Sequence, residues 1–266
     1  MDSKIEQSIL LVRIEGAVAC LTLNRPQAGN SLTMELVARL RAELADLSTR
    51  SAIKVIVLAG AGGRVFCAGH DLNEFAGQSD QDLLAQDFAG LAALMQQIMM
   101  QPQIVIAKVE GVATAAGCEL VAACDLALAS SVARFGAPGI NIGFWCHTPQ
   151  IQLSRAVGRK DAMMMLATGR LFAATHALRI GLVNAVHEPE ALDAAVDALV
   201  AEIAAKPGPV LALGKAAFRT QAAMDVADAY GFAQDSALAN LDLPDAREGI
   251  SAFLEKRTPR WSDDCN

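Results

Sequence analysis

Three short apolar runs, separated by loops and helical stretches, restrict most strongly what this chain can fold into. Residues 53–59, 104–109 and 125–129 are dominated by Val, Ile, Leu and Ala, as is typical of strands buried on both faces of a parallel sheet. A helical pattern over residues 80–100, ended by Pro102, separates the first two runs. Strands that alternate with helices in this way predict βαβ crossovers and an α/β fold with a largely parallel sheet.

The N-terminal part adds a hairpin and a helix to this pattern. Residues 9–14 and 18–23 read as strands on either side of Glu15-Gly16, which is a turn signal. Thr33 is a candidate N-cap for a helix that runs to about residue 49. Its apolar positions recur at helical spacing and predict one buried face, made of Leu36, Val37, Leu40, Leu44 and Leu47.

From residue 148 onward the chain is predicted to be mostly helical. Helices are expected over residues 148–157, 160–168, 174–180 and 189–205, and Pro207-Gly208-Pro209 is the clearest linker signal. We therefore expect a core domain over residues 1–206 and a helical region over residues 207–266. Because so small a set of amphipathic helices has little core of its own, it is expected to pack on its own core domain or on a neighbouring subunit.

Charge and cysteine usage exclude several classes of protein. The 266 residues carry a formal charge of −7, so phosphate neutralisation would not favour binding to nucleic acid or to an anionic membrane surface. No apolar run approaches the roughly 18 residues of a membrane helix, and the first residues lack the form of a signal peptide. The six cysteines form no Cys-x-x-Cys pair. We expect a cytoplasmic protein with reduced core cysteines, no metal site and no cofactor.

The first loop that could carry chemistry is Phe66-Cys67-Ala68-Gly69-His70-Asp71-Leu72, which follows the first buried run. Ligands of open α/β folds lie beyond the carboxyl ends of the strands, and small residues let a backbone N–H approach a ligand. Gly60, Gly62 and Gly63 do not complete a dinucleotide-binding fingerprint, because position 65 is Val. An ordinary surface turn remains the alternative for this loop.

The second loop runs from Gly111 through small residues directly into a helix that begins near Gly117. Unpaired N–H groups at a helix start point at whatever lies beyond it. Glu119 lies in the first turn, and helix capping is the alternative to a catalytic role. A capping box with Thr114 would require the acidic residue at position 117, which is Gly. A carboxylate among apolar neighbours is expected to have a raised pKa.

Taken together, the two loops predict an oxyanion hole. One backbone donor from each loop would stabilise the negative charge that develops on a thioester carbonyl as it becomes an enolate. A carboxylate beside that hole would suffice for proton transfer next to the thioester.

These residues resemble the crotonase superfamily of enoyl-CoA hydratases and isomerases. The resemblance spans nearly the whole chain and rests on five motifs in order: Leu23-Asn24-Arg25-Pro26 with Gly29-Asn30-Ser31-Leu32, residues 66–72, Gly117-Cys118-Glu119-Leu120 with Cys124-Asp125, Phe135-Gly136-Ala137-Pro138, and Gly181-Leu182-Val183 with the ending 248–257.

The resemblance implies a fold of repeated ββα units with a C-terminal helical trimerisation region, in a homotrimer or dimer of trimers. It implies an acyl-CoA thioester as substrate. The implied oxyanion donors are the N–H groups of His70 and Ala116, and the implied CoA-binding residues are Ala68, His70, Asp71, Leu72, Asn73 and Ala116, with Phe253 and Lys256 reaching CoA from an adjacent subunit.

The sequence departs from the family pattern at one catalytic position. Family hydratases use two glutamates; the first corresponds to Glu119, whereas the second corresponds to Gly139. His147 takes the place of a glycine in the following loop and is a candidate second acid/base group, the alternative being a solvent-facing or capping histidine. Phe144 and Trp145 are expected to narrow the acyl pocket. A glutamate restored at position 139 would be expected to raise hydration.

The sequence therefore predicts an acyl-CoA enzyme, nominally an enoyl-CoA hydratase or isomerase, with Glu119 as its single carboxylate acid/base. Because the second glutamate is absent, two alternatives stay open: different enolate chemistry, such as decarboxylation or thioester hydrolysis, and a catalytically weak acyl-CoA-binding protein.

Overall fold

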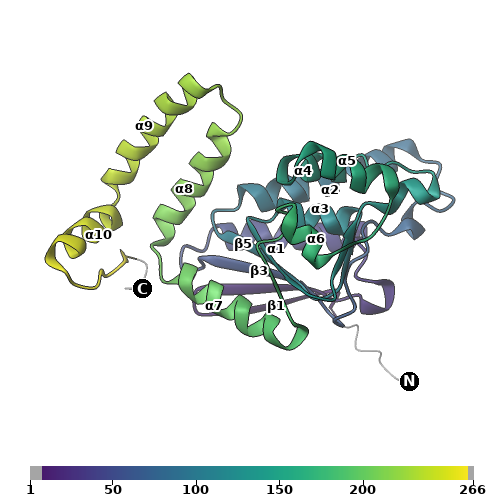
Figure 1. The fold of residues 1–266 in the computed structure, drawn as a ribbon, viewed down its shortest axis with the longest axis horizontal. Helices are drawn as coiled ribbons and strands as arrows, with labels where there is room; N and C mark the ends of the chain where they lie inside the picture. Colours follow the sequence, from purple (N-terminus) through teal and green to yellow (C-terminus); the bar gives the residue numbers. More distant parts are fainter. Residues whose placement is uncertain (1–7, 263–266) are drawn as a thin grey trace.

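The computed structural model describes residues 8–262, which form two sheets, a layer of helices and a helical arm (Figure 1). The larger sheet has the strand order β1-β2-β3-β5-β7-β10, and the smaller one has the order β4-β6-β8-β9. The strands are β1 (Leu10–Glu15), β2 (Val18–Leu23), β3 (Val55–Gly60), β4 (Val65–Cys67), β5 (Ile104–Val109), β6 (Val112–Thr114), β7 (Leu126–Ser130), β8 (Arg134–Gly136), β9 (Phe172–Ala173) and β10 (Ala185–His187).

Both predicted features of the larger sheet are confirmed. β1 and β2 pair antiparallel as a hairpin, and β2, β3, β5, β7 and β10 pair in parallel. The three apolar runs become β3, β5 and β7 at the centre of this sheet. Each of them passes into a short strand of the smaller sheet, β4, β6 or β8 respectively, before a helix follows. This repetition is the ββα arrangement that the family resemblance implied.

The short strands correct one part of the sequence analysis. Residues 60–72 and 111–116 were expected to be loops, but residues 65–67 and 112–114 pair in parallel with each other as β4 and β6. Strands of three residues are too short to produce an alternating pattern that can be recognised in the sequence. The pairing matters because it fixes the two candidate loops against each other.

The helices lie close to their predicted ranges. They are α1 (Met34–Ser48), α2 (Gln81–Met100), α3 (Ala116–Ala123), α4 (Pro149–Ala156), α5 (Arg159–Thr168), α6 (Ala174–Arg179), α7 (Leu192–Ala204), α8 (Gly208–Gln221), α9 (Val226–Asp242) and α10 (Pro244–Glu255). The Thr33 side chain accepts a hydrogen bond from the N–H of Leu36, and α1 buries the five apolar residues that the spacing predicted. None of the helices in residues 8–262 is long and apolar enough to cross a membrane.

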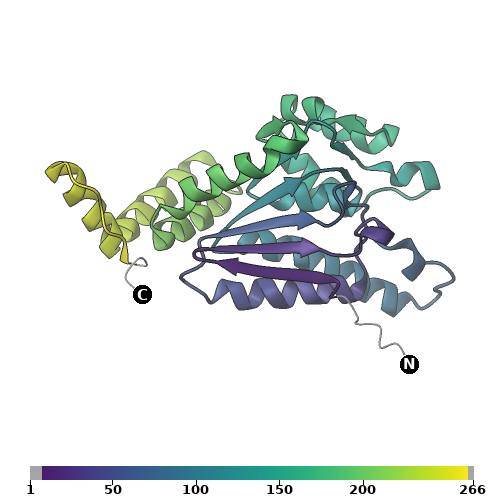
Figure 2. The ribbon, with the colours of Figure 1, turned by 90° about the horizontal axis from the view of Figure 1, so that it is seen from below.

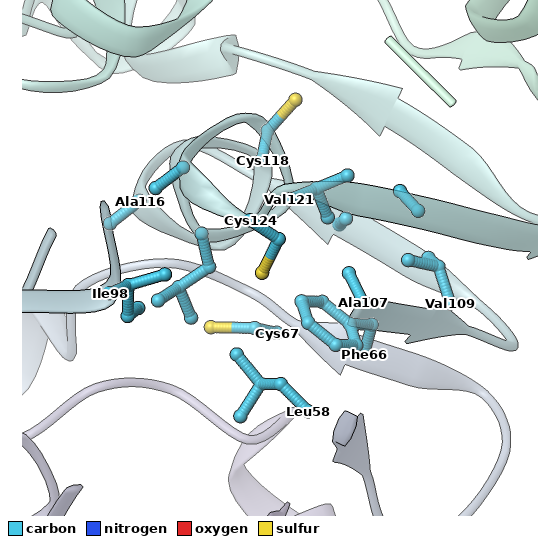
Figure 3. Close-up of a cluster of buried hydrophobic side chains, with 14 of the residues drawn as sticks. Leu58, Phe66, Cys67, Ile98, Ala107, Val109, Ala116, Cys118, Val121 and Cys124 are labelled. Carbon is cyan, nitrogen blue, oxygen red and sulfur yellow. The ribbon is translucent and has the colours of Figure 1, made fainter. Parts of the chain in front are cut away.

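The core between the sheets and α3 is built from small and medium side chains. Figure 3 shows Cys124, directly after α3, turned toward Cys67 and Phe66 of β4, whereas Cys118 lies on the opposite side of the helix. A Cβ on Gly117 would collide with the carbonyl group of Cys67, so glycine is required for this close approach.

The cysteines that the structure describes are free thiols, as expected, and all but Cys20 are buried. Burial raises the pKa of Cys67 and Cys118 to about 12, so both remain protonated and pack as small apolar groups. Cys265 lies outside the described residues.

The last three helices extend away from the sheets as an arm (Figures 1 and 2). α8 is held to the core by an ion pair at its middle, where Lys215 Nζ lies 2.5 Å from one oxygen of Asp125 and Arg219 lies 2.8 Å from the other. α9 buries none of its residues, and α10 buries only Asp245 and Ala252. The division at residues 206 and 207 remains a prediction.

Candidate active site

The segments that follow β4 and β6 lie against each other. Since β4 and β6 are parallel neighbours, their carboxyl ends emerge at the same edge of the smaller sheet. The Thr114 hydroxyl donates to the carbonyl of Ala68 at 2.9 Å. Gly69 has a φ of +99°, and a Cβ there would lie 2.9 Å from the Cβ of Ala115 and 3.2 Å from the nitrogen of Ala116. Position 69 must therefore be glycine for the two segments to approach this closely.

The two N–H groups expected to form the oxyanion hole have no acceptor within residues 8–262. The carbonyl of Gly69 accepts from Leu32 and the N–H of Asp71 donates to Leu32, which leaves the intervening N–H of His70 unused. Ala116 is the first residue of α3, so its N–H has no acceptor inside the helix. Two unused backbone donors, one from each segment, are the arrangement that stabilises an oxyanion.

The turn into α3 holds the backbone in an unusual conformation. Its N-cap is Ala115, with φ 50° and ψ −121°, and no side chain caps the helix. Such a conformation is rare and costs about 1–3 kcal/mol for a residue with a Cβ. The N–H of Ala115 donates to the carbonyl of Gly136 at 2.9 Å, which helps to hold the turn. The strain lies directly before the candidate donor Ala116.

Glu119 is the buried carboxylate of this site. The residue is only 2% exposed, its Oε2 atom has no hydrogen-bond partner within the described chain, and it caps neither end of α3. Burial raises the pKa of Glu119 to about 7, although a hydrogen bond from the Thr148 side chain lowers it in part. A carboxylate with this pKa can both accept and return a proton near neutral pH. The expectation of a raised pKa is confirmed.

Thr148 is a contact that the sequence analysis missed. It stands at the N-cap of α4, but its hydroxyl interacts with Glu119 rather than with the helix. The signal was present in the sequence as a hydroxyl residue before Pro149. In the sequence, Thr148 is indistinguishable from a helix N-cap. Its contact with Glu119 becomes visible only in the folded chain.

The structure corrects the expectation for position 139. A Cβ on Gly139 would overlap the carbonyl oxygen of Phe144 and lie 2.9 Å from the Sγ of Cys146. The N–H of Phe144 also donates to the carbonyl of Gly139 at 3.0 Å, which closes the loop tightly. Gly139→Glu is therefore expected to disturb this loop rather than to supply a second carboxylate.

Three candidate residues follow Gly139, and they differ in exposure: Phe144 and His147 form an exposed pair, whereas Trp145 is partly buried. The rings of Phe144 and His147 lie 5.9 Å apart, and both residues are exposed. Trp145 packs against the main core instead, and its indole N–H donates to Gln150. No hydrogen bond joins His147 to Glu119 in the described part of the chain.

The side chain of His70 is more deeply placed than that of His147. Its Nε2 atom lies 2.6 Å from Oδ2 of Asp87 on α2, and the two side chains are 10% and 4% exposed. The imidazole packs against Phe75 and Phe88, with ring centroids 4.4 and 5.8 Å away. Phe88 also stacks on Phe144 at 6.3 Å, so a row of rings runs from His70 to His147. The sequence analysis used only the backbone of His70 and missed Asp87.

Glu74 joins this cluster, and the three groups offer ligand atoms within 4.8 Å of one another. Two ligands of one transition metal, each about 2.1 Å from it, are separated by about 3 Å or more. The contact between His70 and Asp87 is shorter than this, and the Glu74 carboxylate accepts from the N–H of Met34. The cluster is therefore a close contact between His70 and Asp87 with a neighbouring acid, and we do not identify it as a metal site.

The residues expected to contact CoA occupy two distant places. Ala68, Leu72 and Asn73 are exposed beside the two unused donors. Phe253 is 81% exposed on α10, and Lys256 ends the same helix. Because α10 lies on the arm, apart from α2 and α3 (Figure 1), these two residues do not join the site within one chain.

Asp71 has a mainly structural set of contacts. Its carboxylate accepts from Ser31 and Asn73 and pairs with Arg25 at 2.9 Å. Burial alone would raise the pKa of Asp71, but the hydrogen bonds from Asn73, Arg25 and Ser31 hold it below its ordinary value. Asp71 thus ties residues 25–31 to the segment that carries His70.

A separate hollow of about 1120 Å³ lies between α8 and the core. Its lining includes Ile104, Gln152, Lys215 and Phe218, and it includes none of the candidate site residues. The hollow is therefore a feature of the arm and its attachment rather than of the active site.

The two sheets, the repeated ββα units and the C-terminal helices define a crotonase fold. A family model described as enoyl-CoA hydratase/isomerase matches residues 13–264. The structure of an enoyl-CoA hydratase from Mycobacterium smegmatis superposes with a TM-score of 0.93 at 46% identity, covering 96% of this chain and 99% of that one. The human enoyl-CoA hydratase domain-containing protein 3 superposes with a TM-score of 0.93 at 37% identity, covering 96% of this chain and 100% of the other.

A curated relative from Danio rerio, also an enoyl-CoA hydratase domain-containing protein 3, is 42% identical over 260 residues, which are 97% of this chain and 90% of the relative. The chain belongs to the enoyl-CoA hydratase/isomerase family. The Danio rerio protein is named as mitochondrial; a cytoplasmic location for this chain remains a prediction.

Proposed function

We propose that this protein acts on acyl-CoA thioesters through an enolate, as an enoyl-CoA hydratase or isomerase that uses one carboxylate. The observation that carries the proposal is that α3 holds both an unused backbone donor, at Ala116, and the buried carboxylate of Glu119, whose Oε2 atom has no partner in the described chain. The second unused donor, at His70, lies in the segment packed against the start of α3. The donors would bind the thioester oxygen, and Glu119 would move the proton. The similarity to named enoyl-CoA hydratases supports the same substrate class.

The proposed chemistry uses the two backbone donors and Glu119 in separate roles. As the carbonyl oxygen gains negative charge, two fixed N–H donors stabilise it without reorganising. Burial keeps part of the Glu119 population protonated near neutral pH, so the same group can take a proton in one step and return it in the next.

The position of Gly139 supports a second candidate, namely enolate chemistry other than hydration. Hydration by a pair of carboxylates requires a side chain that this loop lacks, and the loop has no space for it. Decarboxylation or thioester hydrolysis in the same oxyanion hole would not require the second carboxylate. A catalytically weak acyl-CoA-binding protein is the remaining alternative.

A panel of acyl-CoA thioesters distinguishes these candidates. Purified protein is incubated with crotonyl-CoA, a short malonyl-type CoA ester and a saturated acyl-CoA, and the products are identified by mass. Gain of water indicates hydration, loss of carbon dioxide indicates decarboxylation, and release of free CoA indicates hydrolysis. Thioester binding without any product would instead support the binding protein.

Ala116→Pro tests the oxyanion hole itself. Proline is tolerated at the first position of a helix but carries no N–H. The variant is expected to lose turnover and to bind the thioester, but not free CoA, more weakly than the unaltered protein does. Circular dichroism and a thermal melt establish whether the variant is folded. A folded Ala116→Pro protein with full turnover would contradict the proposal.

We also propose that the arm makes the homotrimer, or dimer of trimers, that the family resemblance implies. The arm exposes large apolar side chains, including Phe218, Tyr230 and Phe253 at 71%, 77% and 81%. Phe253 and Lys256 would then reach CoA bound to an adjacent subunit. Removal of residues 248–266 is expected to lower the oligomer mass, measured by light scattering, and to weaken CoA binding at the same time. A truncated protein that keeps both its mass and its affinity would contradict this assignment.

A further inference from the structure

The missing carboxylate at position 139 leaves the proposed reaction with one proton-transferring group and a need for a second. His147 was the sequence candidate, but it is exposed and no hydrogen bond links it to Glu119 within residues 8–262. Another imidazole, that of His70, is only 10% exposed and belongs to the residue that carries one of the two unused donors.

We propose that the His70 side chain is the second catalytic group of this site and that Asp87 is its positioning residue. The inference rests on the proposed function, since it names the group that would give the proton to an enolate formed there.

The contact with Asp87 determines which ring nitrogen is available. Nε2 lies 2.6 Å from the Asp87 carboxylate, and a carboxylate at this distance favours a proton on that nitrogen. The other nitrogen, Nδ1, is then left for chemistry. This is the division of roles in catalytic dyads, in which a buried carboxylate orients an imidazole whose other nitrogen acts on the substrate.

Covalent geometry keeps Nδ1 close to one of the two unused donors. Nδ1 is only a few bonds from the backbone nitrogen of the same residue, and that nitrogen carries one of the two unused N–H donors. A thioester oxygen bound by this N–H would therefore lie within a few bond lengths of the residue that carries the imidazole. Phe75 and Phe88 pack against the ring and restrict its orientation.

Two buried polar atoms in the cluster lack a directed hydrogen bond in the part of the chain that the structure describes. These are Nε2 of His70 and Oδ1 of Asp87. Although the short contact holds the two groups together, a buried polar atom without a hydrogen bond costs stability. Such a cost is typical of functional sites rather than of packing.

The proposed step balances without any further reactant. Glu119 takes a proton from water as the water oxygen bonds to Cβ of the enoyl group, and the electron pair of the C=C bond moves into the enolate. The imidazolium of His70 gives its Nδ1 proton to Cα, and the enolate becomes the thioester carbonyl again. The proton on Glu119 then returns to His70 through solvent, so one water has been added and both groups are restored.

The decisive variant is His70→Gln, because it removes the acid while the backbone N–H of the oxyanion hole remains. The hydration of crotonyl-CoA is measured to obtain kcat and KM. Exchange of the Cα protons of butyryl-CoA in D₂O reports proton transfer without net reaction. Calorimetry gives the affinity for butyryl-CoA. We expect kcat and the exchange rate to fall by about 10²–10⁴-fold, with affinity unchanged. Asp87→Asn is expected to lower both rates by about 10–100-fold, as for other residues that orient a functional imidazole.

Two further measurements separate catalysis from packing. His176 also stacks on a phenylalanine, Phe172, at 4.5 Å, but it lies outside the site, so His176→Gln is a matched control that is expected to keep the full rate. In His70→Ala, added imidazole is expected to restore part of the lost rate, which a purely structural defect would not allow.

The inference and the proposed function fail in different ways. If Glu119→Gln abolishes turnover while His70→Gln keeps the full kcat, or loses only affinity, the inference is wrong and the proposed function stands. Equal losses in His147→Ala and Glu119→Gln, with none in His70→Gln, would assign the second role to His147. If the unaltered protein neither hydrates crotonyl-CoA nor exchanges the protons of butyryl-CoA, both are overturned.

Discussion

Helix α3 has a carboxylate in its first turn and another directly after its last turn, and the two differ in almost every contact. Glu119 is buried with one hydrogen bond from Thr148, and its Oε2 atom lacks a partner within the described chain. Asp125 accepts from the N–H of Val105 and pairs with Lys215 and Arg219 of α8. A carboxylate with an unpartnered oxygen and a fully paired one thus lie six positions apart in the chain.

The difference indicates two functions for the two ends of one helix. A buried carboxylate without a counter-charge weakens the fold at neutral pH, so its presence suggests chemistry. A carboxylate with two cations from a distant helix connects parts of the fold, and Asp125 attaches α8 to the central sheet. The comparison predicts that activity depends on the first end and stability on the second.

The largest expected effect is on activity, at the N-terminal end. Glu119→Gln keeps the shape of the side chain but removes the acid/base group, so turnover of crotonyl-CoA is expected to fall by about 10²–10⁴-fold. The denaturation midpoint at pH 7 should not decrease. The exposed Glu202 on α7 provides the control, because Glu202→Gln should leave both turnover and stability unchanged. A Glu119→Gln protein with normal turnover would break the comparison.

The next largest effect is on stability, at the C-terminal end. Asp125→Ala leaves the buried Lys215 without its partner, and breaking a buried pair in this way costs about 3–5 kcal/mol of unfolding free energy. Urea denaturation measures the loss. Asp193→Ala is the matched control, since Asp193 is 76% exposed and its contact with Lys108 lies at the surface, where an ion pair contributes at most about 1 kcal/mol. Equal losses in the two variants would show that the Asp125 pair is not a structural link.

A smaller effect concerns the pH dependence of stability. The pKa of Glu119 rises from 4.5 to about 7 on folding, so the folded protein binds the proton more tightly than the unfolded chain. Its favourable contribution is complete below about pH 4.5 and is lost as the pH rises to about 7, a change of about 3 kcal/mol. Glu119→Gln removes this dependence, so the variant should gain stability relative to the unaltered protein between pH 4.5 and pH 7. Parallel stability curves for the two proteins would contradict the raised pKa.

The smallest effect concerns the hydrogen bond to Glu119. The Thr148 side chain lowers the pKa of Glu119 against the larger effect of burial, so Thr148→Val is expected to raise this pKa further. The pH at which turnover reaches half its maximum should then move upward, with little change in the maximal rate. Ser154→Val, a loss of a hydroxyl on the exposed face of α4, should leave the pH profile unchanged. A downward shift in Thr148→Val would assign the hydroxyl a different role.

The sequence predicted the fold better than it predicted the site. Apolar runs and helical spacing identified the central strands and α1, because burial imposes periods that the sequence must follow. Residues 65–67 and 112–114 were expected to be loops, since three residues give no period. Those short strands nevertheless place Gly69 against Ala116.

Some residues of the site could likewise be predicted from the sequence, and others could not. Glu119 could be recognised from its position in a helix start, and the pKa increase followed from its apolar neighbours. Thr148 and Asp87 could not, because each reaches the site from a helix that is distant in sequence and each has an ordinary local explanation. Position 139 was expected to accept a carboxylate, and only the packing of Phe144 and Cys146 against it shows that the space is filled.

The donors at residues 70 and 116 belong to the peptide backbone, and this has a consequence for how such a protein can change over generations. A substitution at position 70 alters the ring, the charge and the neighbours of the site, but every residue except proline still supplies the N–H. Position 70 can therefore vary in what it offers the acyl group while the electrostatic core of the reaction persists. A variant that has lost the imidazole therefore still keeps both donors of the oxyanion hole.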